Sequence, residues 1–241
     1  MSKPRSASLF HFTGSINFLK NILKNGLFPR YCQEDHEWFG IEEKVAYPMC
    51  CFCDIPLSRI NEHTSFYGAY GIGFTKDWGL KNKLNPVIYC SDNGLVPRIS
   101  GYLLHGSGTE TDEQKKDREL NFWRLLKLVK PLSGSMVVGG KVISKDFYQE
   151  SEWRFTPEEN ISDTILFESE YKETIEEHNK AMENYKLEFL PSDVKYIFVK
   201  QDSDIPEIVD FINNNLGQYP LNDLKILSSR IISLDTVAFD L

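Results

Sequence analysis

The sequence lacks the segments that would direct a protein into or across a membrane. Its N-terminus, Met1 to Ser8, is polar and contains no apolar signal-peptide core. No stretch approaches the roughly 20 apolar residues of a membrane span. We therefore expect a cytosolic protein without membrane contact.

Basic charge is scarce. The chain has 27 Lys and Arg against 35 Asp and Glu, a net charge of −8. Neutralising nucleic-acid phosphates requires clustered Lys and Arg, so this balance argues against a general nucleic-acid ligand. It leaves room for a small-molecule substrate or a protein partner.

The signatures of several enzyme classes are also missing. The glycine pair at 71–73 lacks the third glycine of a dinucleotide-binding fold, and the Gly-Gly-Lys run at 139–141 is not followed by the Ser or Thr of a P-loop. No HExxH or deaminase-type zinc pattern occurs. These absences exclude the best-marked nucleotide and metalloenzyme classes.

Cysteine is sparse and odd in number, with 5 residues. An odd count without a signal peptide argues against a disulfide framework. A zinc-stabilised adaptor is one alternative, with ligands drawn from Cys32, His36, Cys50, Cys51 and Cys53. Their spacing is irregular, and alternate strand residues face opposite ways, so we expect reduced, mostly buried cysteines without metal.

The remaining composition is that of a globular protein. The chain of 241 residues is 41% hydrophobic and 26% charged, enough for one sizeable core or for two small ones. Helical and strand patterns interleave without a βαβ rhythm, which predicts an α+β fold in one domain over residues 1–241. We expect strands at 8–13, 49–55, 70–75, 86–90, 135–138, 152–156 and 195–200, with one or two more in 224–234. We expect helices at 16–25 (capped by Ser15, ended by Gly26), 56–63, 96–104, 117–130, 168–185 and 205–214, and loops at 31–47 and 106–116.

The first segment with chemical potential is His11-Phe12-Thr13. On a strand, Phe10 and Phe12 share one face, which would enter the core. His11 and Thr13 share the other face and would point into a cleft or solvent. A satisfied histidine at a strand end is the plainer interpretation.

Two further segments carry aromatic and charged side chains. Tyr67 to Phe74 combines glycines with rings able to stack on a planar ligand, or forms an ordinary turn into an aromatic strand. Farther along, strand alternation places Glu150, Glu152 and Arg154 on one face, with the carboxylates about 7 Å apart. That face either binds a substrate or is solvated, with Arg154 balancing Glu152.

Together, and in this order, the three segments resemble the pattern of ADP-ribosyltransferases. The wider chain, over roughly residues 8–200, resembles AbiGi-like abortive-infection proteins more closely. The motifs that carry this second resemblance are His11-Phe-Thr with the later Ile-Leu-Lys-Asn-Gly-Leu27, Cys53-Asp-Ile-Pro-Leu57, Tyr70-Gly-Ile-Gly-Phe74 and Glu152-Trp-Arg154.

The transferase resemblance implies two small, mostly antiparallel sheets flanked by helices around a cleft, and NAD as a substrate. Glu152 would stabilise the oxocarbenium-like ribose, and Glu150 would orient or deprotonate the acceptor. Arg154 would reach the pyrophosphate or brace Glu152. No metal is implied.

The same resemblance implies the residues that hold NAD. His11 would bond a ribose hydroxyl, with Thr13 supporting it, and Tyr70 or Tyr67 would stack on nicotinamide. One departure matters, because Gly73 stands where the transferase pattern has a stacking Tyr.

Two functions follow. The first is a phage-defence enzyme that transfers ADP-ribose or hydrolyses NAD. The alternative is an inactive module of the same fold that acts as an antitoxin or sensor by binding a protein partner, as AbiGi-like proteins have been described as antitoxin-like.

Overall fold

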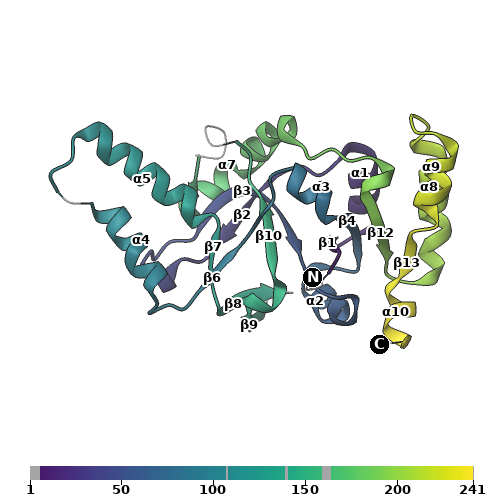
Figure 1. Cartoon of the computed structure of the whole chain (residues 1–241), viewed down its shortest axis with the longest axis horizontal. Coiled ribbons are helices and arrows are strands. Elements are labelled where there is room, and N and C mark those ends of the chain that lie inside the picture. The colour runs from purple at the N-terminus through teal and green to yellow at the C-terminus, as the bar shows by residue number, and fades with distance from the viewer. Residues whose placement is uncertain (1–5, 107, 139–140, 159–163, 241) are drawn as a thin grey trace. The chain divides into compact units, whose positions relative to one another are not determined.

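The computed structural model describes residues 6–106, 108–138, 141–158 and 164–240 (Figure 1). The chain divides into two compact units. Unit 1 contains Met1–Phe28, Cys51–Leu84 and Lys186–Leu241, and unit 2 contains Pro29–Cys50 and Asn85–Tyr185. Of the sequence features above, residues 1–5 and the glycines at 139–140 lie outside the described residues. None of the described helices is long and apolar enough to cross a bilayer.

The sheet of unit 1 has the order β13-β12-β4-β1. Strand β4 (Tyr70–Thr75) runs antiparallel to both β1 (Ser8–Thr13) and β12 (Val194–Val199), and β13 (Ile231–Ser233) runs parallel to β12. The last residue of β3, Cys53, pairs with Phe10. The bounds of β1 and β4 are those expected from their alternating patterns.

Both faces of β1 carry buried residues. Phe10 and Phe12 enter one core cluster, which also contains Ile60, Leu234 and Val237. The opposite face, on which His11 lies, also carries Leu9, which is fully buried. Helix α3 (Lys76–Lys81) packs over Leu9, while His11 and Thr13 on the same face are half-buried.

Helices complete unit 1. α1 (Ile16–Asn25) begins at Ser15, whose side chain accepts a hydrogen bond from the Phe18 backbone, and ends at Gly26 with a φ of 86°. This confirms the predicted caps. The others are η2 (Leu57–Arg59), α2 (Ile60–Tyr67), α3 (Lys76–Lys81), η5 (Pro191–Asp193), η6 (Asp202–Asp204), α8 (Ile205–Asn215), α9 (Leu221–Ser228) and α10 (Leu234–Asp240).

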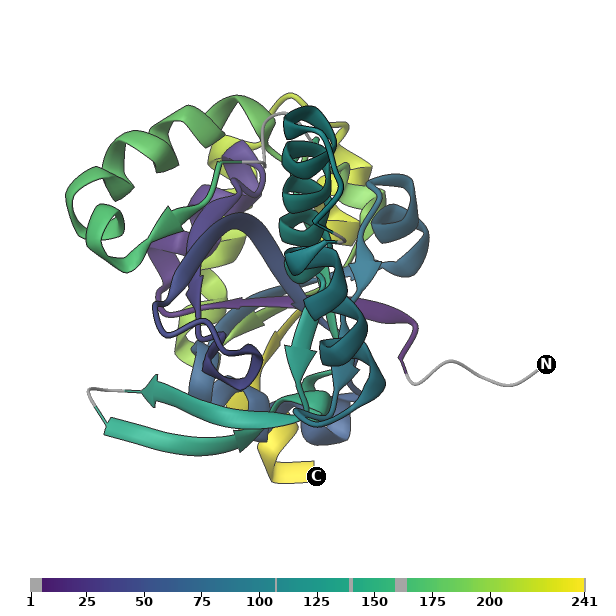
Figure 2. The same cartoon turned by 90° about the vertical axis from the view of Figure 1, so that its left-hand side faces the viewer.

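Unit 2 is built from short strand pairs. β2 (Arg30–Glu34) and β11 (Leu166–Phe167) each run antiparallel to β3 (Val45–Cys53), and β10 (Glu152–Phe155) to β5 (Asn85–Pro86). β6 (Ile88–Cys90) is parallel to β7 (Val129–Pro131). β8 (Ser133–Val138) and β9 (Lys141–Asp146) form a two-stranded ribbon, visible in Figure 2.

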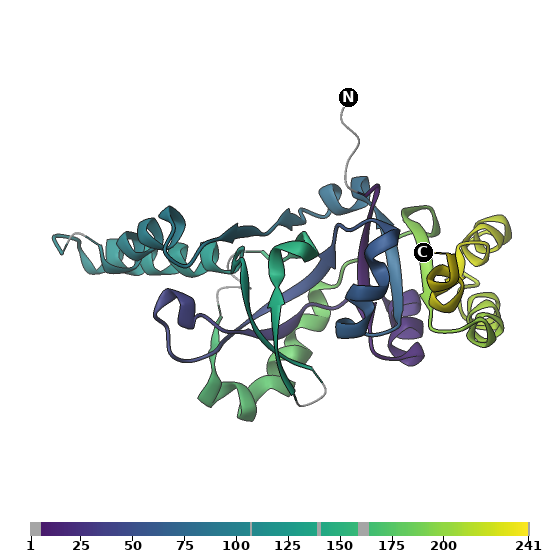
Figure 3. The ribbon, with the colours of Figure 1, turned by 90° about the horizontal axis from the view of Figure 1, so that it is seen from below.

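The helices of unit 2 include the paired α4 (Leu95–His105) and α5 (Asp112–Leu126), which lie side by side in Figure 3. The others are η1 (Glu37–Phe39), η3 (Phe147–Glu150), α7 (Glu168–Ala181) and η4 (Met182–Tyr185). Mostly antiparallel strands with intervening helices in both units confirm the α+β class.

Three secondary-structure expectations are wrong in part. Residues 31–34 and 45–47, at the two ends of the expected loop 31–47, are paired strand residues of β2 and β3. Residues 224–228 of the expected strand region 224–234 belong instead to α9, with Leu224 and Leu227 buried at helical spacing, while β13 confirms a strand at 231–233. Helix α5 starts earlier than expected, at a Thr111–Gln114 capping box, and ends at Leu126, so that Val129 opens strand β7.

Candidate functional site

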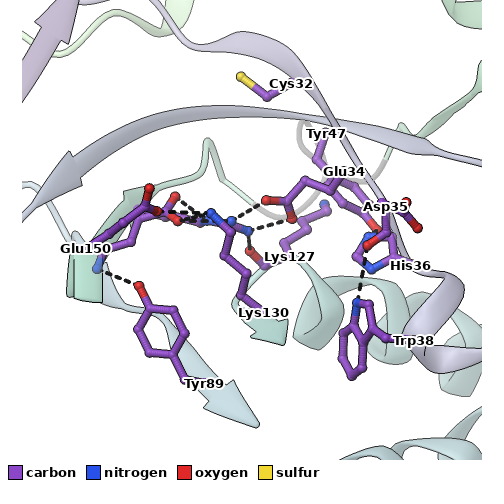
Figure 4. Close-up of polar contacts among 12 residues, drawn as sticks. Cys32, Glu34, Asp35, His36, Trp38, Tyr47, Tyr89, Lys127, Lys130 and Glu150 are labelled. Atoms are coloured by element: carbon purple, nitrogen blue, oxygen red, sulfur yellow. Dashed lines mark hydrogen bonds and ion pairs between the residues drawn. The ribbon is translucent and has the colours of Figure 1, made fainter. Parts of the chain in front are cut away.

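Unit 2 contains a group of charged side chains that are buried or half-buried (Figure 4). It consists of three acids and three bases: Glu34, Glu150, Glu152, Lys130, Lys145 and Arg154. We call these six residues the charge cluster. Their formal charges sum to zero, so the cluster is neutral as a whole.

Arg154 lies at the centre of the charge cluster and uses every one of its N–H groups. Its Nε donates to Glu152 Oε1 at 2.8 Å, and Nη2 donates to Glu152 Oε2 at 3.3 Å. The two terminal nitrogens also bond both oxygens of Glu34, and Nη1 donates to the Lys127 carbonyl at 2.6 Å. Five donors are thus committed, the full set of a guanidinium.

Lys130 joins the two carboxylates that the sequence singled out. Its Nζ lies 2.9 Å from Glu152 Oε2 and 3.3 Å from Glu150 Oε2. Lys145 Nζ lies 2.5 Å from the other oxygen of Glu150. Both carboxylates are therefore already neutralised by the chain's own cations.

The protonation states follow from this arrangement. Burial alone would raise the pKa of Glu152, but Arg154 and Lys130 outweigh burial and hold that pKa well below its usual range. Burial likewise opposes the charge of Lys130, while Glu152 and Glu150 raise its pKa well above the usual value. At neutral pH Glu152 is an anion and Lys130 a cation, so Glu152 is no proton donor.

The backbone places these residues differently from the sequence expectation. Glu152 and Arg154 share a face of β10, as strand alternation predicts, but Glu150 belongs to the 3-10 helix η3. Ser151, with a φ of 46°, turns the chain between helix and strand. The face is also not solvated, because Arg154 is 1% exposed and Glu152 is 6% exposed.

Four of the NAD-binding residues suggested by the resemblance, His11, Thr13, Tyr67 and Tyr70, lie in unit 1, whereas the fifth, Arg154, lies in unit 2. Thr13 pairs directly with Tyr70 across β1 and β4, which places both on the face of His11. His11 Nδ1–H donates to the Cys51 carbonyl at 2.9 Å, which leaves Nε2 as the acceptor nitrogen. Burial lowers the pKa of His11, so its ring is neutral.

The two tyrosines have partners in unit 1. Tyr70 donates its hydroxyl to Asp204 Oδ2 at 3.2 Å. The Tyr67 ring lies 4.6 Å from that of His63, centroid to centroid. That His11 and Glu152 act on the same NAD molecule, as the resemblance implies, stays a prediction.

Gly73 has a packing reason to be glycine. It pairs directly with Phe10 on β1, and a Cβ built on Gly73 would lie 2.9 Å from the Phe10 ring and 3.1 Å from the Tyr196 ring. The aromatic side chains of neighbouring strands fill the space that a side chain at position 73 would need. The packing of this core therefore favours glycine at the position where the transferase pattern has a stacking Tyr.

Sequence reasoning missed a buried His–Tyr pair beside the charge cluster. The Tyr47 hydroxyl lies 2.6 Å from His36 Nε2, and both residues are buried. Burial raises the pKa of Tyr47 and lowers that of His36, so Tyr47 donates to a neutral ring. His36 Nδ1 is buried without a hydrogen-bond partner among the described residues. Because the sequence pattern predicts a loop at residues 31–47, it offers no reason to expect contact between these two side chains.

Glu34, Lys130 and Lys145 were also missed. Glu34 reaches Arg154 across 120 residues of sequence, and Lys130 was assigned to the end of a helix. The signal available in the sequence was a charged residue within each of three short segments, and this is common on surfaces as well.

The cysteines are mostly buried, as expected. Cys50, Cys53 and Cys90 are buried, and Cys32 and Cys51 are half-buried. Burial raises the pKa of the Cys50 thiol well above its usual range and that of Cys90 to about 11. Within the described ranges no three His, Cys, Asp or Glu side chains are grouped to hold a metal ion. The structure thus offers the zinc-adaptor alternative no support there.

Comparison with known proteins decides the family. Residues 25–200, more than half of the chain, match the family described as "Putative abortive phage resistance protein AbiGi, antitoxin". The chain belongs to the AbiGi family.

A curated relative agrees with this assignment. "Abortive phage resistance protein AbiGi" from Lactococcus lactis subsp. cremoris is 28% identical over 248 residues, covering 88% of this chain and 98% of the relative. No solved structure matches the chain. The AbiGi resemblance of the sequence motifs is confirmed, and the chain is a member of a phage-resistance family. The resemblance to ADP-ribosyltransferases stays a prediction.

Proposed function

We propose that this chain is the antitoxin-type component of a phage abortive-infection system and acts by binding a partner toxin. The observation that carries the proposal is the closure of the charge cluster. All five N–H groups of Arg154 and both oxygens of Glu152 are bonded within unit 2. The description of the AbiGi family as an antitoxin supports the same function.

The closed cluster argues against Glu152 as the catalytic carboxylate of NAD cleavage. Such a carboxylate helps by presenting uncompensated negative charge where the ribose becomes cationic. Glu152 faces two cations at 2.8 and 2.9 Å, which cancel most of its field. Arg154 likewise has no N–H left for a pyrophosphate.

A second candidate, an NAD-dependent transferase or glycohydrolase, draws on unit 1. Thr13, Tyr70 and His11 share one face, and the His11 Nε2 acceptor suits a ribose hydroxyl. This alternative needs a carboxylate that is not already neutralised.

The test is a comparison of depletion with overexpression in the native host. An antitoxin-type chain predicts growth arrest when it is depleted, and loss-of-function suppressors that map to one gene, the toxin. An NAD-consuming chain predicts the reverse: arrest on overexpression, a fall in cellular NAD, and heat on calorimetric titration of the purified chain with NAD. Harmless depletion together with NAD turnover would overturn the proposal.

A further inference from the structure

Helix α4 carries an exposed apolar face. Leu95, Ile99, Tyr102 and Leu103 are 58%, 49%, 73% and 38% exposed. Their spacing of i, i+4, i+7 and i+8 places all four on one side of the helix. Ser100, off this side, is buried. We call the four residues the α4 face.

The helix that presents this face is held firmly from behind. α5 packs against α4, and Arg118 of α5 donates to the carbonyls of Leu103 and Leu104 at the end of α4. Arg118 Nε also donates to Glu110 at 2.8 Å, which fixes the guanidinium. Two of the last carbonyls of α4 are thereby satisfied, which favours an ordered helix before a partner binds. A pre-ordered helix loses less entropy when it binds.

The charge of α4 differs from that of the whole chain. α4 contains no Asp or Glu, whereas the chain has a net charge of −8. Its basic residues, Arg98 and His105, are exposed and lie along one flank of the α4 face at 100° per residue. The surface is thus an apolar stripe with a basic edge.

We propose that the α4 face docks into an apolar groove of the partner toxin, with carboxylates of the toxin along the edge that meets Arg98 and His105. This inference rests on the proposed antitoxin function and names its binding surface. Apolar anchors at these helical spacings are how an amphipathic helix fills a groove. A symmetric contact between two antiparallel copies of α4 fits less well, because the two Arg98 flanks would then face each other.

The experiment uses the full chain and the toxin that the depletion suppressors identify, both purified. Calorimetry measures the Kd for the wild type, for Ile99→Glu/Tyr102→Glu, and for a matched control, Leu221→Glu/Ile226→Glu on α9. The control residues are also large and exposed, at 64% and 50%, but lie in unit 1. Circular dichroism checks that each variant is folded, and Tyr102→Ala provides a milder substitution at the same face.

We expect Ile99→Glu/Tyr102→Glu to weaken toxin binding at least 100-fold, because buried aromatic and aliphatic anchors carry most of an interface's affinity. Tyr102→Ala should weaken it about tenfold or more, and the α9 control less than threefold. Arg98→Glu should slow association and reduce its salt dependence.

Three results would overturn the inference. If Ile99→Glu/Tyr102→Glu and Tyr102→Ala leave toxin binding unchanged, the α4 face is not the binding surface. The antitoxin function would still hold in that case. A wild-type dimer in sedimentation that Ile99→Glu/Tyr102→Glu dissolves makes a second copy the occupant. Harmless depletion, with no toxin to bind, removes the antitoxin function and this inference together.

Discussion

Glu152 and Arg154, two residues apart on β10, bond to each other at 2.8 Å while both are buried. Same-face neighbours on a strand normally project in parallel into solvent or core. Here the two side chains bond to each other, and each has a second partner of opposite charge: Glu34 for Arg154 and Lys130 for Glu152. The pair is thus one part of a neutral network of buried and half-buried charges.

Replacing Glu152 with Gln should destabilise the fold. Gln keeps the shape but removes the charge that compensates buried Arg154 and Lys130, and breaking a buried ion pair costs about 3–5 kcal/mol. Chemical denaturation measures the loss. Glu168→Gln, in an exposed pair with Lys172 on α7, is the control and should cost no more than about 0.5 kcal/mol. Equal stability of the two variants would mean that Glu152 is solvated.

The same group predicts how stability depends on pH. The pKa of Glu152 is lower in the folded chain than in the unfolded chain, so unfolding in acid takes up a proton. The stabilisation is complete above about pH 4.3, the ordinary value for Glu, and is lost as pH falls toward the lowered pKa.

Between about pH 5 and 3, the free energy of unfolding should therefore fall more steeply for the wild type than for Glu152→Gln, by up to about 1.4 kcal/mol per pH unit. Denaturant titrations at several pH values measure both slopes. Parallel slopes would show that Glu152 titrates normally in the folded chain.

Arg154→Lys should destabilise even though the charge is kept. A Lys ammonium has three donors and no planar fork, so it cannot bond both oxygens of Glu34, the Lys127 carbonyl and Glu152 together. We expect a loss of at least about 2 kcal/mol, measured by thermal unfolding. Arg98→Lys, at an exposed position of the same unit, should stay within about 0.5 kcal/mol. If Arg154→Lys is as stable as the wild type, the charge cluster contributes to stability through charge balance alone.

Gly73→Ala should also destabilise, by about 1–3 kcal/mol, because its Cβ would press on Phe10 and Tyr196. Gly14→Ala is the control, since no heavy atom lies within 4 Å of a Cβ there. Denaturation curves of the two variants give the comparison. A stable Gly73→Ala would remove the packing explanation for the missing stacking Tyr.

Local patterns were enough to predict much of the fold. The bounds of β1 and β4 follow from alternating residues, and Ser15 and Gly26 mark the ends of α1. Such signals depend on a few neighbouring residues, so no partner needs to be known. Where pairing outweighed local preference the prediction was wrong, as in β2, whose charged residues form a ladder with β3.

By itself the sequence determined the α+β class, the caps of α1, the faces of β1 and the motifs shared with AbiGi-like proteins, because each depends on residues close together in the chain. Only the tertiary structure decided what Glu152 does. Arg154 lies two residues away on the same strand, but Lys130 comes from β7, and Glu34, which bonds Arg154, comes from β2. Whether the charge of a carboxylate serves catalysis or stability depends on which cations the fold places beside it. The spacing of residues along the chain does not show which cations come from other strands.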